Sequence, residues 1–92
     1  MLDSRTAQAG TLESMDCLVT VTGPADGRVI EISGSSAPRF KISMERRVND
    51  VLDSLGCDSG VRVAVQDNGA LDIVLGARVE AAFVRYREGD VR

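Results

Sequence analysis

The stretch Val61-Arg62-Val63-Ala64-Val65 places a valine at every second position. A period of two is typical of a β-strand with one buried face, whereas the apolar residues of an amphipathic helix recur every three or four positions. Asp67-Asn68-Gly69 follows with residues that favour a turn. The alternation therefore predicts a strand in the second half of the chain and argues against an all-helical fold.

A second β-rich region lies between residues 17 and 33. In CLVTVT (17–22) the apolar residues alternate with polar ones, which again predicts a half-buried strand. Gly23-Pro24-Ala25-Asp26-Gly27 is a strong turn signal, and RVIEI (28–32) has the composition of a returning strand. Residues 17–33 are therefore predicted to form a β-hairpin. A short extended segment is expected over 7–12, preceded by a loose tail over 1–6.

The hydrophobic period changes after a predicted loop at 34–38. It becomes that of an amphipathic helix ending at Gly56, with its stripe at Met44, Val48, Val51, Leu52 and Leu55. A second helix is expected from about Ala70 to Arg87, lined by Leu71, Val74, Leu75, Val79, Ala82, Phe83 and Tyr86. The 92 residues are too few for two cores. We expect one small α+β domain over 1–92: a mostly antiparallel β-sheet (β-hairpin, helix, strand, helix) with two helices on one face.

Composition narrows the class of function. A net charge of −3 and three aromatic residues offer neither the basic stripe nor the stacking rings that nucleic-acid binding needs. Arginines do gather near the C-terminus (Arg78, Arg85, Arg87, Arg92), but Glu80, Glu88 and Asp90 are interleaved with them, which favours a solvated helix face. No apolar run has the ~20 residues of a membrane helix, and residues 1–10 have no secretory h-region. We therefore expect a cytoplasmic protein that binds neither nucleic acid nor membrane.

The reactive residue types are few. The chain has no histidine, the usual base for a serine or cysteine nucleophile and the commonest metal ligand, so catalysis by this chain alone and a metal site are not expected. Cys17 and Cys57 form no CxxC pair and are expected to be reduced, semi-buried small hydrophobes, although sequence alone leaves a disulfide open.

The polar break Glu13-Ser14-Met15-Asp16 places a serine hydroxyl between two carboxylates, just ahead of a β-rich segment. A side chain in such a turn is held away from the body of the fold, where another enzyme can reach it. Taken alone, Ser14 is an ordinary turn residue, and the same holds for Glu13 and Asp16.

The chain resembles the acyl carrier subunit (gamma chain) of citrate lyase over nearly its whole length, and three stretches carry the resemblance. AGTLES (9–14) with the following Asp16 resembles that family's attachment region, and VQDNGALDIVLGARVEAA (65–82) is similar to its C-terminal strand, turn and helix. VNDVLDSLG (48–56) resembles its first helix, mostly in helical pattern. The tract from 34 to 44 matches only in pattern, which bears on partner docking rather than on attachment.

The resemblance implies that Ser14 carries a 2′-(5″-phosphoribosyl)-3′-dephospho-coenzyme A group through a phosphodiester, installed by a prosthetic-group transferase. It further implies two partners. The citrate lyase alpha subunit exchanges the acetyl group on the thiol for citrate, and the beta subunit, with Mg²⁺, cleaves the citryl thioester to oxaloacetate. This chain would be a non-catalytic carrier. A role for Glu13 and Asp16 in recognition by the transferase or the large subunits is the alternative to the favoured interpretation, in which they are ordinary turn carboxylates.

Asp53-Ser54-Leu55 offers a competing attachment site, because Asp-Ser-Leu marks the modified serine of all-helical acyl carrier proteins. There the serine opens a helix, whereas here the triplet falls in the last turn of a predicted helix, where the helix dipole disfavours a phosphate. A further serine, Ser59 in Asp58-Ser59-Gly60, is assigned to the loop between the predicted helix and the following strand.

Other functions stay open, among them the carrier of a lyase that acts on a related substrate such as citramalate. The acyl carrier subunit of malonate decarboxylase uses the same group, but its serine tends to be flanked by glycine, whereas Ser14 lies between Glu13 and Met15. A cofactor-free α+β interaction module is also compatible with the composition.

Overall fold

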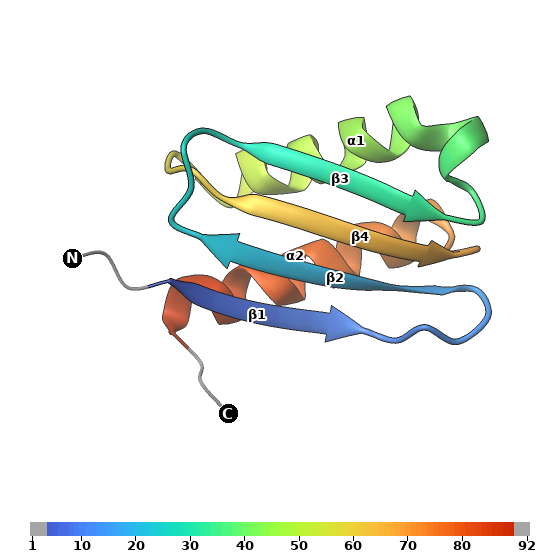
Figure 1. Ribbon diagram of the computed structural model, residues 1–92, viewed down its shortest axis with the longest axis horizontal. Helices are drawn as coiled ribbons and strands as arrows, with labels where there is room; N and C mark the ends of the chain where they lie inside the picture. Colours follow the sequence, from blue (N-terminus) through green and yellow to red (C-terminus); the bar gives the residue numbers. More distant parts are fainter. Residues whose placement is uncertain (1–3, 90–92) are drawn as a thin grey trace.

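The structure is a computed structural model that describes residues 4–89. Its elements, in chain order, are β1 (Arg5–Gly10), β2 (Asp16–Gly23), β3 (Val29–Gly34), α1 (Ala37–Ser54), β4 (Arg62–Asn68) and α2 (Asp72–Glu88). The four strands form one sheet, and both helices lie on the same face of it (Figure 1). The predicted α+β class and the two-helix layer are confirmed.

The strand order is β1-β2-β4-β3, so the strand predicted from the VRVAV alternation occupies the interior of the sheet. β2 pairs antiparallel with β1 and with β4, whereas β3 runs parallel to β4. The sheet is therefore mixed. The predicted hairpin over residues 17–33 is wrong, because β4 lies between β2 and β3; the hairpin of this fold joins β1 to β2.

The connection between β2 and β3 shows why the prediction failed. It passes over the start of β4, where the Ala25 amide donates to Gly60 O at 3.0 Å and the Val29 amide donates to Val61 O at 2.9 Å. A Cβ at Gly60 would stand 1.8 Å from Ala25 O, so only glycine permits this crossing. Turn residues indicate where the chain bends, but they do not determine which strand the next one pairs with.

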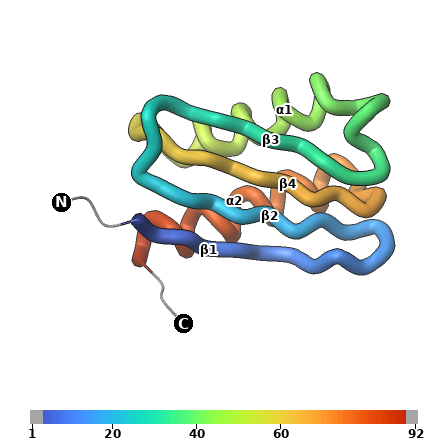
Figure 2. Tube along the Cα trace, in the orientation of Figure 1, coloured from blue at the N-terminus to red at the C-terminus, as the bar shows by residue number. Residues whose placement is uncertain are grey.

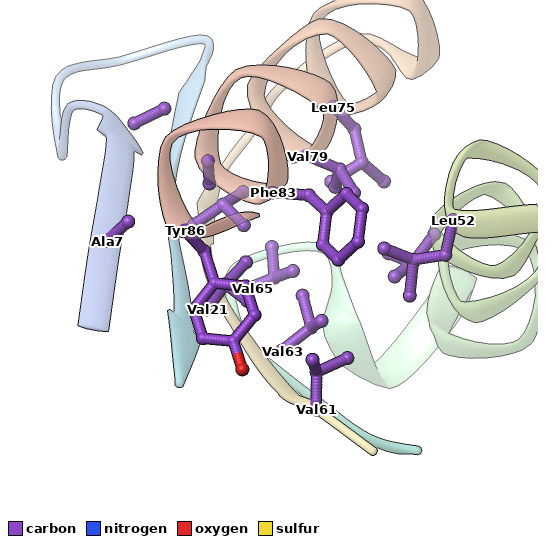
Figure 3. Close-up of a cluster of buried hydrophobic side chains, with 14 of the residues drawn as sticks. Ala7, Val21, Leu52, Val61, Val63, Val65, Leu75, Val79, Phe83 and Tyr86 are labelled. Carbon is purple, nitrogen blue, oxygen red and sulfur yellow. The ribbon is translucent and has the colours of Figure 1, made fainter. Parts of the chain in front are cut away.

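The core lies between the sheet and the helices. Cys17, Val19 and Val21 of β2 and Val63 and Val65 of β4 are at most 1% exposed, which confirms both predicted alternations. Figure 3 shows Phe83 of α2 and Leu52 of α1 reaching into the same space as the sheet valines. The predicted helical stripes also face this core, with two exceptions: Leu71 precedes α2 and is 57% exposed, and Val74 is only half-buried and lies outside the core cluster.

The starts of β1 and α1 differ from expectation. Arg5 and Thr6 belong to β1 rather than to a loose tail, and residues 1–3 of that tail lie outside the described residues. α1 begins inside the predicted loop, with Pro38 in its first turn, where its fixed φ and missing N–H are tolerated.

No helix within residues 4–89 is long and apolar enough to cross a membrane.

Three connections meet at one end of the sheet: the β1–β2 loop, the β3–α1 turn and the β4–α2 turn (Figures 1 and 2). Ser14 lies in the first of them. This end of the molecule therefore brings together segments that are far apart in the sequence.

Candidate functional site

Ser14 lies at the tip of the β1–β2 loop with its side chain exposed. The Asp16 amide donates to Glu13 O at 3.2 Å, which closes a four-residue turn with Ser14 and Met15 at its centre. Met15 has φ +65°, the left-handed conformation that a type II turn requires at its third position and that usually selects glycine. The predicted polar turn is confirmed, and it presents the serine hydroxyl outward.

The loop is fastened to the sheet on both sides of Ser14. The Met15 amide donates to Asn68 O at 2.7 Å, and Asn68 Nδ2 donates to Leu12 O at 3.0 Å. The Thr11 amide donates to Cys17 O at 3.2 Å at the base of the loop. Asn68, at the end of β4, therefore holds the residues on either side of the Glu13–Ser14 pair.

Asp16 anchors the loop rather than standing free beside the serine. Arg78 of α2 grips its carboxylate with Nε at 3.0 Å and Nη2 at 2.9 Å, and Thr11 Oγ1 and the Cys17 amide each donate to it at 2.7 Å. These hydrogen bonds, from Arg78 first, then Thr11 and Cys17, hold the pKa of Asp16 well below its usual value. Asp16 therefore stays ionised at neutral pH and ties the loop to α2, while Glu13 is the exposed carboxylate beside Ser14.

Gly10, at the end of β1, makes this geometry possible. Its φ is +101°, and a Cβ there would stand 1.9 Å from Cys17 O. The two strands can approach so closely only because residue 10 has no side chain.

The competing serine has a different environment. Ser54 lies in the last turn of α1, as predicted, and its Oγ donates to Val51 O of the same helix at 2.8 Å. Asp53 beside it accepts a hydrogen bond from Arg28 at 3.0 Å. Ser54 is thus bound into a helix C-terminus, where the dipole is unfavourable for a phosphate; Ser59 lies in the predicted loop.

Both cysteines are free thiols and buried. Burial, and then the negative charges of Asp16 and Asp67, raise the pKa of Cys17 to about 11. A thiol in that state is a poor nucleophile at neutral pH. Within residues 4–89 no cluster of three potential ligands is placed to hold a metal ion.

The arginines of α2 do more than solvate a helix face. Besides the Arg78 pair, Arg85 donates to Gln8 O of β1 and Arg87 to Leu55 O, each at 2.6 Å. Arg92 and Asp90 lie outside the described residues. Sequence reasoning missed the Arg78–Asp16 pair because 62 residues separate its members.

A family model described as "Malonate decarboxylase delta subunit (MdcD)" matches residues 4–86. Several curated relatives are named citrate lyase acyl carrier protein. One from Haemophilus influenzae (strain PittGG) is 48% identical over 82 residues, which are 89% of this chain and 84% of the relative. Another from Pectobacterium atrosepticum is 43% identical over 82 residues, 88% and 83% of the two chains.

The chain belongs to the citrate lyase acyl carrier protein family. A more distant member, from Rhodopseudomonas palustris (strain BisA53), is still 38% identical over 88% of this chain. No solved structure matches the chain. The resemblance stated from the sequence is thus confirmed at the level of the family. The description of the matching family model names malonate decarboxylase, whereas the curated relatives are named for citrate lyase.

Proposed function

We propose that this chain is the acyl carrier subunit of citrate lyase and that Ser14 Oγ holds 2′-(5″-phosphoribosyl)-3′-dephospho-coenzyme A through a phosphodiester. When bound, this group supplies a thiol that carries the acetyl or citryl unit as a thioester. In this proposal a transferase installs the group, the alpha and beta subunits of citrate lyase perform the chemistry, and the chain itself catalyses no step.

One observation supports the site above all others: Ser14 is exposed in a loop whose neighbouring residues are held. Asn68 fastens Leu12 and Met15, and Arg78 fastens Asp16. Within the part of the chain that the structure describes, Ser14 Oγ makes no hydrogen bond with protein. A transferase would therefore meet a hydroxyl at a fixed place without having to break an existing contact.

The surroundings also suit a phosphodiester. Asp16, two residues after Ser14, has its charge offset by the Arg78 guanidinium through two hydrogen bonds. Glu13 is exposed, so water screens its charge. The loop thus presents a serine without a buried, uncompensated negative charge opposing the phosphate.

The decisive experiment is the intact mass and peptide map of protein purified from its native host while it uses citrate. We expect an adduct of the phosphoribosyl-dephospho-coenzyme A mass on the peptide containing Ser14. The adduct should vanish in Ser14→Ala and persist in Ser54→Ala, the matched control at the competing serine. An adduct on another residue would refute the site, and an unmodified chain in such cells would favour a cofactor-free interaction module.

The malonate decarboxylase carrier is a second candidate, because the matching family model bears that description. The glycine that tends to flank its serine does not exclude it here. Met15 has φ +65°, so a glycine would fit the same turn. Release of the bound acyl group with hydroxylamine separates the two candidates: citryl hydroxamate supports citrate lyase, and malonyl hydroxamate supports malonate decarboxylase.

A further inference from the structure

An open groove of about 360 Å³ lies between the first half of α1 and the β4–α2 turn. Its walls include Phe40 and Met44 from α1 and Ala70, Leu71 and Leu75 from the opposite side. The volume is near the lower end of small-ligand pockets, which occupy roughly 300–1,000 Å³. Phe40 and Leu71 are 50% and 57% exposed, so two large apolar side chains at this groove are left open to solvent.

The groove begins beside the Ser14 loop. Gly69 forms part of its wall, and a Cβ added at Gly69 would lie 3.8 Å from the Met15 amide nitrogen. Asp16 also forms a β-bridge with Gly69. A group attached to Ser14 therefore starts next to one end of the groove.

Positive charge lies in a depression next to the groove. Arg39, Lys41 and Arg46 line a depression that shares Phe40 and Ser43 with the groove. Among residues 4–89 none of the three forms an ion pair, although the whole chain is acidic. The groove's own carboxylate, Asp72, is paired with Arg47, which leaves the local balance positive.

Phe40 and Arg39 are suited to a nucleobase. The Arg39 guanidinium carbon lies 5.4 Å from the centroid of the Phe40 ring. Aromatic rings and guanidinium planes are the two kinds of side-chain surface on which bases stack. Phe40 is also the point where α1 departs from helical geometry, with φ −120° and ψ 16°.

We infer that this groove, defined by Phe40, Met44, Gly69, Ala70, Leu71 and Leu75, is a docking site for the adenosine of the group carried on Ser14. This inference rests on the proposed function. In that group the phosphoribosyl unit joins the serine to adenosine, so adenosine is the part of the arm that emerges near Gly69. Its base lies against Phe40 and Leu71, the pyrophosphate faces Arg39, Lys41 and Arg46, and the pantetheine portion remains free to move.

The test uses ¹⁵N-labelled protein matured in its native host, compared with Ser14→Ala protein from the same host. Intact mass first establishes whether the adduct is present, and amide NMR spectra then locate the arm. We expect shifted amide signals at Phe40 and at 69–71, and nuclear Overhauser contacts between adenine protons and the Phe40 ring.

Two variants set the size of the effect. Phe40→Ala should lower the ratio of docked to free adenosine about tenfold, the lower part of the range for losing one stacking partner. Leu71→Ala should also lower it, whereas Ile73→Ala, a matched control that is 78% exposed and outside the groove, should leave it unchanged.

The outcomes separate the inference from its premise. An adduct on Ser14 with shifts confined to residues 11–16 overturns the docking site, leaves the proposed function standing and leaves the groove free for a partner subunit. Equal effects of Leu71→Ala and Ile73→Ala also overturn it. Absence of the adduct refutes the proposed function and this inference together.

Discussion

Asp67 is a buried carboxylate on which two walls of the groove depend. It is 4% exposed, and its side chain accepts hydrogen bonds from three backbone amides: Ser36 at 3.2 Å, Gly69 at 3.1 Å and Ala70 at 3.0 Å. Ser36 precedes α1, while Gly69 and Ala70 lead into α2. We predict that replacing Asp67 lowers the free energy of unfolding more than replacing any exposed carboxylate does.

The expected size follows from the number of amides left without a partner. A hydrogen bond to a charged group contributes roughly 1.5–3 kcal/mol, and an unsatisfied buried donor costs roughly 1–3 kcal/mol. The three bonds share one carboxylate, and amides near the surface regain some water, so we expect Asp67→Ala to cost about 3 kcal/mol. Asp67→Asn keeps one acceptor oxygen and should cost about 1.5 kcal/mol.

Urea unfolding of the whole chain measures the effect, with Asp58→Asn as the matched control in an exposed loop. The control should change the free energy of unfolding by no more than about 0.5 kcal/mol. If Asp67→Asn and Asp58→Asn shift the urea midpoint equally, the three hydrogen bonds do not contribute as argued.

The same experiment has a pH dependence of known sign. Burial alone would raise the pKa of Asp67, but the hydrogen bonds from Gly69, Ser36 and Ala70 outweigh it and lower the pKa below the ordinary 3.8. A carboxylate with a lowered pKa stabilises the fold above its unfolded value and loses that contribution as the pH falls through the folded value. The gap between wild type and Asp67→Asn should therefore be constant near neutral pH and narrow below about pH 4; a gap that widens in acid would refute the assignment.

Two further predictions concern the loop that holds Ser14. Arg78→Ala should slow modification of Ser14 by the transferase in a timed mass assay while leaving the fold intact by circular dichroism, because the Asp16 carboxylate loses two hydrogen bonds. Arg62→Ala, which removes the exposed ion pair with Glu31 at the start of β4, is the control, and equal rates for the two variants would show that Arg78 does not position the loop. Met15→Gly should retain full modification of Ser14 and should not lower the urea midpoint. Glycine removes about 1 kcal/mol of strain at the left-handed φ of residue 15, which offsets the entropy it adds to the unfolded chain. A large loss of stability would mean that the exposed Met15 side chain makes a stabilising contact.

The elements of the fold were predictable where one face is buried continuously. The period of two in 61–65 predicted β4, and the stripe from Met44 to Leu55 predicted α1, because burial imposes its own period on the sequence. β1 was only weakly indicated, since RTAQAG contains just two buried residues, Ala7 and Ala9, and both are small. The pairing of β3 with β4 was not predictable, because nothing local in residues 23–28 encodes the later close approach of Gly60.

In the candidate site, too, local features were predictable from the sequence and long-range contacts were not. The exposed turn around Ser14 followed from its polar composition. Asp67 and Asn68 belong to β4 rather than to the predicted turn, although Asp67 does accept the amide of Gly69 two residues on. The fastening of the loop was missed, because Asn68 and Arg78 reach it from 56 and 62 residues away. Local sequence therefore predicted that the serine is exposed, whereas only the fold explains why its position is fixed.

A fixed anchor changes what the tether can do. Effective concentration between a tethered group and its target falls roughly as the −3/2 power of tether length once the tether is long enough to span the sites. A mobile loop would add its own length to the arm, whereas a loop held by Asn68 and Arg78 adds none. Docking of adenosine in the groove would shorten the moving part further, to the pantetheine portion alone. The proposed carrier would then combine a rigid base with a short swinging end, so mutations that free the adenosine should slow transfer between the large subunits even though Ser14 stays fully modified.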